Sequence, residues 1–477
     1  MTLSYPFDST SKLYQQTRIS HWDKIAIKRD AWQGMGRWYH QRLTEIYKFL
    51  VSPNQRILEI GCGTGDLISQ LNPSHGVGID FSSEMIGRAK KQNPHIEYHQ
   101  LDVHDLSTLE GEFDIIIFSD TINDLWDVQL ALEQVKKFCK PHTRIILNFY
   151  SHLWQIPLTI AQTLNLASPL LNQNWLTVED VNNLLRLSGF ETIRNSQEVL
   201  FPLPLGSLAN RYLVKLFPFN IFALSNFVVA RPIPTPAPQP SVSVVVAARN
   251  EEGNIKNIFE RLPKMGSKTE LIFVEGHSKD NTYQTILDEI PLHPSTPSLV
   301  FQQSGIGKAD AIRLGFEKAS GDILMILDAD LTVPPEDLPR FYEAIVSGTG
   351  EFINGVRLVY PMEKEAMQTL NFIGNKLFSM TFSWLLGQPI KDTLCGTKVM
   401  WRKDYEQIAT NRSYFGDFDP FGDFDLIFGA AKLNKKIIDL PIRYRERVYG
   451  TTNISRWKHG LLLLRMVMFA ARRIKFV

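Results

Sequence analysis

Short runs rich in β-forming residues, most of them apolar, alternate with longer stretches of helical periodicity along most of this 477-residue chain. The runs that favour strands lie at 56–60, 77–80, 97–100, 114–118 and 144–149, and again at 243–247, 271–275, 299–302 and 323–327. Strand–helix alternation predicts an α/β fold with mostly parallel sheets, in which ligands bind beyond the carboxyl ends of the strands.

A proline-rich segment separates the two halves of the chain. Proline occupies every second position from 232 to 240. Each proline fixes φ and removes a backbone N–H, so the segment favours extended polyproline II over a helix or a central strand. A new apolar strand follows at 243–247. The sequence therefore predicts one domain at 1–230, a linker at 231–240 and a second domain at 241–477.

Composition narrows the functional classes. Apolar residues make up 44% of the chain, charged residues 21%, and the formal net charge is +1. This is typical of a folded globular protein and gives no chain-wide basic field, so we expect no nucleic acid partner. The scattered Cys62, Cys139 and Cys395 predict neither a disulfide framework nor a zinc cluster, which fits the cytoplasm. No apolar run reaches the ~18 residues that a membrane span requires, so we expect any membrane contact to be peripheral.

A glycine-rich turn follows the first strand. Gly61, Gly63 and Gly65 would let the backbone approach a ligand that a Cβ atom would obstruct. Glu59 lies just ahead of them and would repel a pyrophosphate, and the third glycine of a dinucleotide loop is absent. A zwitterionic amino-acid tail therefore fits Glu59 better, with a dinucleotide oxidoreductase as the alternative.

Two acids continue this pattern along the next two strands. Asp80 ends the second strand, at the distance expected for an acid that accepts the ribose hydroxyls. Asp102 follows the third strand and is adjacent to Val103. The ordered set of glycines and acids predicts a nucleotide-like cofactor.

With these motifs, residues 30–230 resemble the class I S-adenosylmethionine-dependent methyltransferases. The matching segments are 59–65, 80–85, 101–103, 113–118 and 187–190. The resemblance implies a Rossmann-like domain that ends in an antiparallel hairpin and binds S-adenosylmethionine. It implies a cofactor site made of Glu59, Gly61, Gly63, Gly65, Asp80, Asp102 and Val103, with the first glycines beside the methionine part, Asp80 on the ribose and Asp102 near the adenine.

The methyl acceptor is indicated less clearly. Asp120, Asn123 and His152 follow the fourth and fifth strands and could act as a base or orient an acceptor. Polar residues at these places more often end strands or cap helices, and small size explains Cys62 as well as reactivity does. No catalytic residue is assigned in this half.

The central signal of the second half is an acidic pair at the end of a strand. Asp328-Ala-Asp330 follows the apolar run at 323–327. Two neighbouring carboxylates repel each other unless they share a cation, and oxygen ligands suit Mg²⁺ or Mn²⁺. Such an ion would also bind the diphosphate of a nucleotide sugar and neutralise charge on the leaving group. Asp328 and Asp330 are therefore the predicted metal ligands.

Residues 241–477 resemble the family 2 glycosyltransferases of the GT-A fold, through segments 244–253, 273–282, 307–311 and 321–322. Segments 328–336, 391–398 and 440–453 are similar to the polyprenyl-phosphate sugar synthases, the group of the dolichyl-phosphate mannosyltransferases. The resemblance implies inverting transfer from a UDP- or GDP-linked sugar to a lipid-phosphate or glycan acceptor. It implies donor contacts from Asn250, Glu251, Glu275, Asp280, Lys308, Asp328 and Arg357, and a phosphate contact from Arg447 in catalysis.

A second acidic cluster spans 415–425. Asp423 is the expected catalytic base, because a sugar hydroxyl would need one. A phosphate acceptor is already anionic and would not, so the acceptor stays open. A loop cluster that only organises local hydrogen bonds is the alternative.

The C-terminal stretch 443–477 carries nine Lys or Arg against one Glu, interleaved with apolar residues. It predicts a basic amphipathic helix on an anionic membrane, together with the apolar run at 372–386, or else a helix packed on the domain. We therefore expect a bifunctional transferase, cytoplasmic and peripheral on the inner face of the membrane. The alternatives are a glycosyltransferase whose first domain only senses S-adenosylmethionine, and a membrane-surface scaffold.

Overall fold

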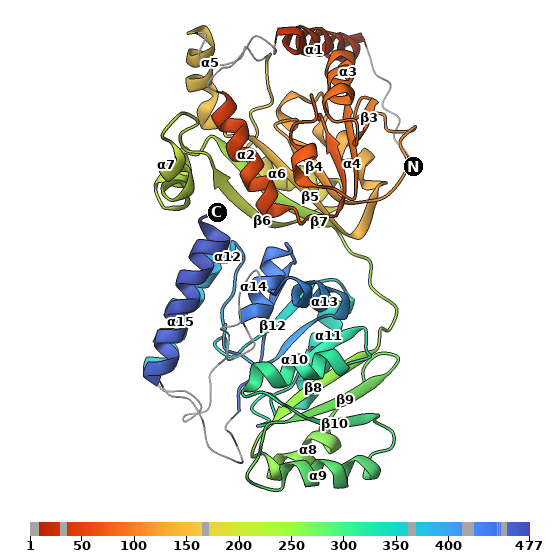
Figure 1. The fold of residues 1–477 in the computed structure, drawn as a ribbon, viewed down its shortest axis with the longest axis vertical. Coiled ribbons are helices and arrows are strands. Elements are labelled where there is room, and N and C mark those ends of the chain that lie inside the picture. Colours follow the sequence, from red (N-terminus) through yellow and green to blue (C-terminus); the bar gives the residue numbers. More distant parts are fainter. Residues whose placement is uncertain are drawn as a thin grey trace. The chain divides into compact units, whose positions relative to one another are not determined.

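The computed structural model describes residues 9–28, 36–164, 171–360, 369–412, 424–445, 447, 449 and 456–477. Its chain divides into two compact units, which are described separately: Met1–Ile233 with Phe476–Val477, and Pro234–Lys475. Figure 1 shows that each unit has a central sheet with helices around it.

The N-terminal unit contains a seven-stranded sheet of order β3-β2-β1-β4-β5-β7-β6. Its strands are β1 (Arg56–Ile60), β2 (His75–Asp80), β3 (Glu97–Gln100), β4 (Phe113–Ser119), β5 (Cys139–Tyr150), β6 (Phe190–Glu198) and β7 (Ser225–Pro232). The first five are parallel, and β7 runs antiparallel to both β5 and β6. The predicted parallel sheet with a final antiparallel hairpin is confirmed.

Helices cover both faces of this sheet because its central strands are apolar on both sides. In β1, Ile57 packs into one core cluster and Leu58 into another. Alternate residues of a strand point to opposite faces, so a continuous apolar run requires cover on each. The helices of this unit are α1 (Ser9–Lys28), α2 (Gly36–Leu50), α3 (Ser83–Gln92), α4 (Val128–Lys136), α5 (Gln155–Thr163), α6 (Val178–Leu187) and α7 (Ser207–Arg211).

The second unit has a mixed sheet of order β10-β9-β8-β11-β13-β12-β14. Its strands are β8 (Val242–Ala248), β9 (Thr269–Glu275), β10 (Ser298–Gln302), β11 (Ile323–Ile326), β12 (Phe352–Val356), β13 (Lys398–Trp401) and β14 (Ile437–Pro441). Only β13 is antiparallel to its neighbours. The sheet is packed by α8 (Glu252–Arg261), α9 (Thr282–Glu289), α10 (Lys308–Lys318), α11 (Leu338–Val346), α13 (Arg402–Thr410) and α14 (Phe424–Lys432).

The linker between the two units begins later than predicted, because β7 includes its first residues. Strand β7 continues to Pro232, where that residue pairs only with Phe190 of β6, because pairing with β5 stops at Ala230. A proline can end a strand on a side that needs no donor, so the predicted linker loses its first two residues to the sheet. The division between the units falls after Ile233.

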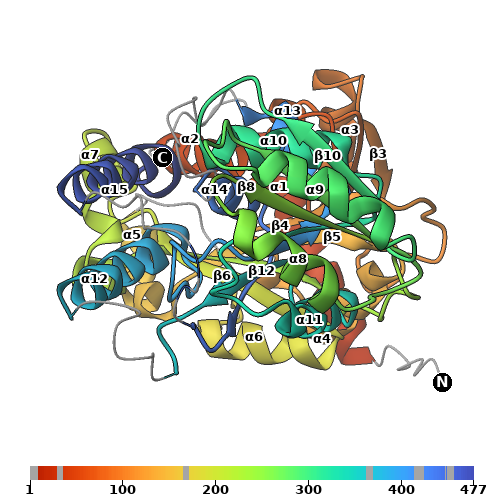
Figure 2. The same cartoon turned by 90° about the horizontal axis from the view of Figure 1, so that it is seen from below.

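Two further helices of the second unit, α12 (Thr369–Leu386) and α15 (Arg456–Ala470), lie side by side in Figure 2. Leu463, Met466 and Ala470 are buried on one side of α15. Large apolar residues at helical spacing are exposed on both helices: Leu377, Met380, Trp384, Leu461, Leu464 and Met468. In the described part of the chain, no helix combines the length and the apolar character that crossing a membrane requires.

Candidate active sites

The glycine-rich turn of the N-terminal unit has the backbone conformation that glycine allows. Gly61, Gly63 and Gly65 have φ of 68°, 53° and 75°. A Cβ on Gly61 would lie 2.6 Å from the Thr121 hydroxyl, whereas one on Gly63 would meet nothing within 4 Å. The turn therefore packs tightly on one side and is open at Gly63, where the backbone can approach a ligand.

The two acids beside this turn are held by backbone amides. Gly63 N–H and Ser82 N–H donate to the Asp80 carboxylate at 3.0 and 2.9 Å, and Ile68 N–H donates to Glu59 at 3.1 Å. Burial raises the pKa of Asp80 to about 6 and that of Glu59 to about 8. The surroundings of Asp80 and Glu59 thus favour either the neutral form of each acid or a cationic group beside it. The role of Glu59 toward an ammonium group stays a prediction.

Asp102 and Val103 follow β3, as predicted. Asp102 accepts hydrogen bonds from the backbone and ring of His104, at 2.9 and 2.5 Å, and from Gln15 at 2.5 Å. Burial raises the pKa of Asp102, but the His104 contacts outweigh it, and the pKa lies below its usual value. Val103 is buried in the core cluster.

Sequence reasoning missed α1, which spans the carboxyl ends of three strands. Besides Gln15, Arg18 and Trp22 of this helix each donate to Asp124 at 2.7 Å, and Asp23 accepts from Ser82 at 2.5 Å. Figure 1 shows α1 at this end of the sheet. The helix was missed because the methyltransferase motifs begin only after it. The polar residues that bind the strand ends are the signal that could have revealed it.

Asp120 lies at the centre of a polar cluster after β4. It has a φ of 54° and accepts hydrogen bonds from the Tyr39 hydroxyl at 2.8 Å and from Asn148 at 2.5 Å. Burial raises the pKa of Asp120 to about 7. A positive φ in a residue other than glycine is a strained conformation that often marks functional sites. Asp120 therefore combines position, partners and pKa suited to a base.

The other two candidates near the methyl acceptor differ from Asp120. Asn123 is fully buried and joins chain segments, because its side chain donates to Asn174 O at 2.7 Å and accepts from Tyr150 N–H at 3.1 Å. These bonds support the structural interpretation of this residue. His152 is exposed and begins a short helix after β5.

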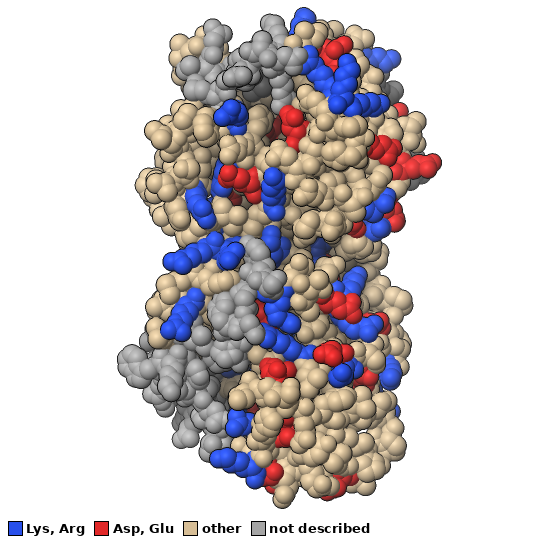
Figure 3. Space-filling view, in the orientation of Figure 1, with Lys and Arg blue, Asp and Glu red and all other residues tan. Residues whose placement is uncertain are grey.

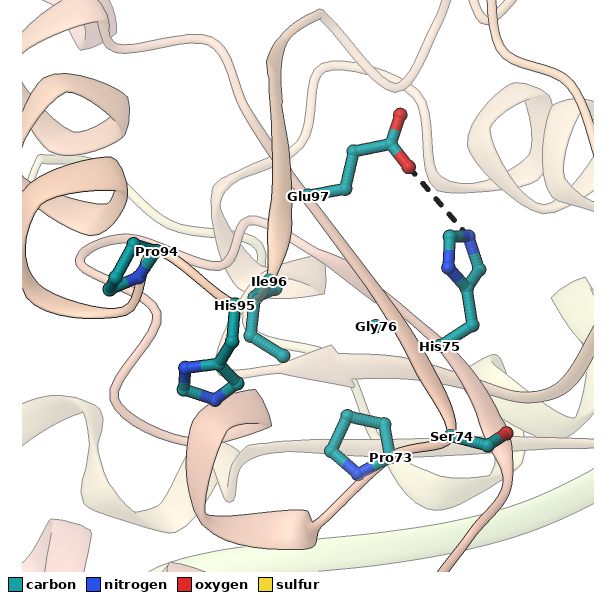
Figure 4. Close-up of a pocket in the computed structure, with 8 residues that line it drawn as sticks. All are labelled: Pro73, Ser74, His75, Gly76, Pro94, His95, Ile96 and Glu97. Carbon is teal, nitrogen blue, oxygen red and sulfur yellow. Dashed lines mark ion pairs between the residues drawn. The ribbon is translucent and has the colours of Figure 1, made fainter.

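One pocket of about 330 Å³ lies at the amino ends of the strands in the same sheet, opposite to their carboxyl ends. It is formed where β2 and β3 begin, and His75 and Glu97 point toward one another there, at 3.7 Å (Figure 4). Ligands of parallel sheets bind at the carboxyl ends of the strands, so this pocket is not part of the cofactor site.

In the second unit, an arginine joins three distant segments. Arg447 donates to Asp330 at 2.6 Å and to Glu251 at 3.4 Å. Glu251 follows β8 and Asp330 follows β11, and these two strands are parallel neighbours in the sheet. Burial raises the pKa of Glu251 to about 6. The structure therefore brings together the predicted phosphate-binding arginine, a donor residue and a metal ligand.

The other predicted metal ligand faces a lysine. Lys308, the first residue of α10, donates to Asp328 at 2.5 Å. Burial raises the pKa of Asp328, but Lys308 outweighs it and holds the pKa below its usual value. Among the described residues, no cluster of three or more His, Cys, Asp or Glu side chains could hold a metal alone. The two carboxylates fit a divalent cation that takes its other ligands from a diphosphate.

Arg357 forms a two-bonded ion pair with Asp392. The distances are 2.7 and 2.9 Å, and Asp392 also accepts from Arg357 N–H at 3.2 Å. The carboxylate is 1% exposed, and its pKa lies below the usual value because Arg357 outweighs burial. Asp392 is not among the predicted site residues, although it lies in segment 391–398, which is similar to the polyprenyl-phosphate sugar synthases.

The remaining predicted donor residues organise the loops after β8 and β9. Asn250 Oδ1 accepts from Lys279 N–H at 2.8 Å, and Glu275 accepts from Ser278 N–H at 2.5 Å. Asp280 accepts from Thr282 N–H at 3.1 Å. These bonds shape the edge of the site, and direct donor contacts from these residues stay predictions.

The predicted base Asp423 lies outside the described residues. Asp425, from the same cluster, is the second residue of α14, and its carboxylate contacts Arg313 and Arg412, both at 3.3 Å. This part of the cluster thus forms ion pairs within the domain.

Two curated proteins are each similar to just under half of this chain. The chain is 34% identical over 235 residues to the undecaprenyl-phosphate 4-deoxy-4-formamido-L-arabinose transferase of Aeromonas hydrophila, covering 48% of this chain and 65% of the relative. It is 32% identical over 220 residues to the dolichol-phosphate mannosyltransferase of Pyrococcus furiosus, covering 45% and 59%. The chain thus spans less than two thirds of the length of either relative.

The chain is also similar to a solved structure and matches two family models. A solved S-adenosylmethionine-dependent methyltransferase from Thermotoga maritima is 17% identical, with a TM-score of 0.36, and covers 45% of this chain and 98% of its own. Two family models match separate parts of the chain, one for a methyltransferase domain and one for glycosyl transferase family 2. Residues 51–189 therefore belong to a methyltransferase domain, and residues 243–409 belong to a glycosyl transferase family 2 domain.

Proposed function

We propose that the second domain transfers a sugar from a nucleotide-sugar donor to a polyprenyl phosphate, with inversion at the anomeric carbon. The observation that carries this proposal is the contact of Arg447 with both Asp330 and Glu251, beside the Lys308–Asp328 pair. Basic groups and carboxylates alternate there at the ends of β8 and β11. Such an edge suits a diphosphate and its cation together.

In this mechanism an acceptor oxygen attacks the anomeric carbon while the bond to the leaving diphosphate breaks. Arg447 and Lys308 would compensate the negative charge that grows on that diphosphate. Asp328 and Asp330 would hold Mg²⁺ or Mn²⁺, which neutralises the same charge when bound. A phosphate acceptor needs no base, and a glycan hydroxyl would take Asp423 for that role.

The lipid acceptor is supported by the relatives and by the exposed apolar sides of α12 and α15. Both relatives are named for transfer to a polyprenyl phosphate. Lys475 lies 5.0 Å from the ring centre of Trp384, which places a cation beside an interfacial aromatic residue. We therefore propose that this domain lies peripherally on the cytoplasmic face of a membrane.

We further propose that the first domain binds S-adenosylmethionine and transfers its methyl group. The open side of Gly63 and the carboxyl groups of Glu59 and Asp120 suit a ligand with cationic ammonium and sulfonium groups, and Asp80 would accept hydrogen bonds from its ribose hydroxyls. Asp120 would accept the proton that the acceptor loses when its oxygen or nitrogen is methylated.

The first experiment is a thermal-shift panel of UDP, GDP and their sugars, with and without Mn²⁺, followed by transfer of labelled sugar to a polyprenyl phosphate. We expect metal-dependent stabilisation by one nucleotide and labelled lipid. Asp288→Asn, on the exposed face of α9, is the matched control for Asp330→Asn. Nucleotide stabilisation that is equal in wild type and Asp330→Asn would contradict the donor assignment.

The second experiment separates a methyltransferase from a sensor. Calorimetric binding of S-adenosylmethionine and release of S-adenosylhomocysteine in the presence of a membrane extract are measured together. Binding with release supports methyl transfer. Binding without release in any extract would favour the sensor domain.

A further inference from the structure

The N-terminal unit exposes a large apolar surface that its cofactor site does not use. One part is the segment 152–164, which contains α5, a helix in which no residue is buried. Ile156 and Ile160, four residues apart on this helix, are 72% and 54% exposed. A helix gains little from packing when its apolar stripe faces water, so this stripe requires a partner.

The second part is the segment 201–222, which connects β6 to β7. Leu205, Leu208 and Phe217 are 97%, 70% and 82% exposed. The two parts adjoin, because the Trp154 indole donates to Phe222 O at 2.9 Å. We call residues 152–164 and 201–222 together the apolar platform. In Figure 3 the surface at α7, on the left of this unit, is largely free of charged colours.

The charge of the platform indicates what covers it. Residues 152–164 contain no Lys, Arg, Asp or Glu, and residues 201–222 contain no acid. The side chain of Lys215 is 9% exposed and pairs with Glu198, so Arg211 is the exposed cation of the platform. Protein interfaces have a polar rim, whereas segments at a bilayer surface combine Leu, Ile, Phe and Trp with basic residues alone. An apolar surface that has no exposed acid and carries an exposed arginine is complementary to an anionic lipid surface.

The position of the platform links it to methyl transfer. Its first segment begins directly after β5, which ends at Tyr150. The Tyr150 ring lies 5.9 Å from that of Tyr39, whose hydroxyl donates to Asp120. The platform therefore starts beside the candidate base, at the edge of the sheet where an acceptor would enter.

We propose that the apolar platform docks the N-terminal unit on an anionic bilayer, and that the methyl acceptor is a lipid-linked molecule presented from that bilayer. This inference rests on the proposed methyl transfer. It adds a second membrane surface to the one on α12 and α15, carried by a different domain.

Vesicle flotation of the full chain tests the docking. The vesicles contain phosphatidylcholine and phosphatidylglycerol, with pure phosphatidylcholine as the comparison. Every variant carries Met380→Glu and Met468→Glu, which remove the α12 and α15 surface. In this background we expect Ile160→Glu with Leu208→Glu to weaken flotation about tenfold.

Leu187→Glu is the matched control. Leu187 is 56% exposed, but it precedes β6 whereas the second part of the platform follows that strand. Equal flotation of the platform variant and the control would overturn the proposal. Retained binding of S-adenosylmethionine shows that the platform variant is folded. If the platform variant loses only self-association in sedimentation, with flotation unchanged, the surface belongs to a second copy and the proposal fails.

A labelled methyl group distinguishes the acceptor from the docking. S-adenosylmethionine with a tritiated methyl is supplied with membranes, and the label is counted in the lipid extract. We expect the platform variant to lose label with intact membranes and to recover it with detergent-dispersed lipids. Label only in water-soluble products would overturn the lipid acceptor. No label even with wild type would refute methyl transfer itself, while flotation still decides the docking.

Discussion

Three acids of the N-terminal site and two acids of the second site are held in opposite ways, whereas Asp102 and Glu251 do not follow this contrast. In the N-terminal site, Glu59, Asp80 and Asp120 bind backbone amides, a tyrosine hydroxyl and an asparagine amide, and burial raises the pKa of each. In the second site, Asp328 and Asp392 face Lys308 and Arg357, and the pKa of each lies below its usual value.

This difference indicates the charge of the ligand that each site suits. Buried carboxyl groups without a matched cation are stabilised by a positive ligand, such as the sulfonium and ammonium of S-adenosylmethionine. Carboxylates that already form ion pairs with lysine and arginine provide both signs of charge in one place. Such a site suits a diphosphate and a metal ion that bind together. The contrast therefore predicts different responses to mutation and pH.

Removing a proposed metal ligand should have the largest effect. Asp328→Asn leaves Lys308 without its carboxylate partner and removes a predicted metal ligand. We expect glycosyl transfer to fall about a thousandfold, with S-adenosylmethionine binding unchanged. Initial rates at saturating Mn²⁺ measure this, with Asp288→Asn as control. Wild-type rates in Asp328→Asn would remove the basis for the metal assignment.

Breaking the buried ion pair should mainly reduce stability. Asp392→Asn leaves the Arg357 guanidinium facing a neutral amide, and we expect the free energy of unfolding of this domain to fall by about 3 kcal/mol. Asp337→Asn, which removes a partly exposed partner of Arg340 at 3.9 Å, should cost about 0.5 kcal/mol or less. Hydrogen exchange in β12 measures both values. Equal losses in the two variants would contradict the distinction.

Methyl transfer should depend on the ionisation of Asp120. Because burial raises the pKa of Asp120 to about 7, its basic form increases as pH rises. We expect the rate to rise with pH and to be half-maximal near pH 7. Asp120→Asn should lower the rate about a hundredfold and abolish that dependence. Asp105→Asn, in the exposed loop after β3, is the control. A pH profile shared by wild type and Asp120→Asn would exclude this base.

The smallest effect is expected at Glu59. Burial raises the pKa of Glu59 to about 8, so it is protonated at pH 7. A cationic ligand favours its carboxylate, and affinity should therefore increase as pH rises toward and past 8. We expect the affinity of wild type relative to Glu59→Gln to rise about tenfold from pH 7 to pH 9. Calorimetry with S-adenosylhomocysteine measures this. A constant ratio would show that Glu59 does not meet the ammonium.

Most of the fold follows from local patterns. The strands predicted at 56–60 and 97–100 coincide with β1 and β3. In β1 the prediction follows from its apolar residues, because a central parallel strand is buried on both faces. The exact end of β7 at Pro232 did not follow, since it depends on which neighbouring strand still pairs there. The role of α1 also did not follow, because its polar contacts are with residues about 60 to 110 positions away.

The order of residue types along each half is enough to predict the local motifs. The glycine turn, Asp80, Asp102 and the Asp328–Asp330 pair were all predicted, because each depends on local spacing at a strand end. Which basic residue pairs with which acid depends on the tertiary structure. Arg447 reaches Asp330 across 117 positions and Arg357 meets Asp392 across 35, and these contacts fix the charge of the second site. Pairing depends on how the sheet arranges distant loops, which spacing along the chain does not reveal.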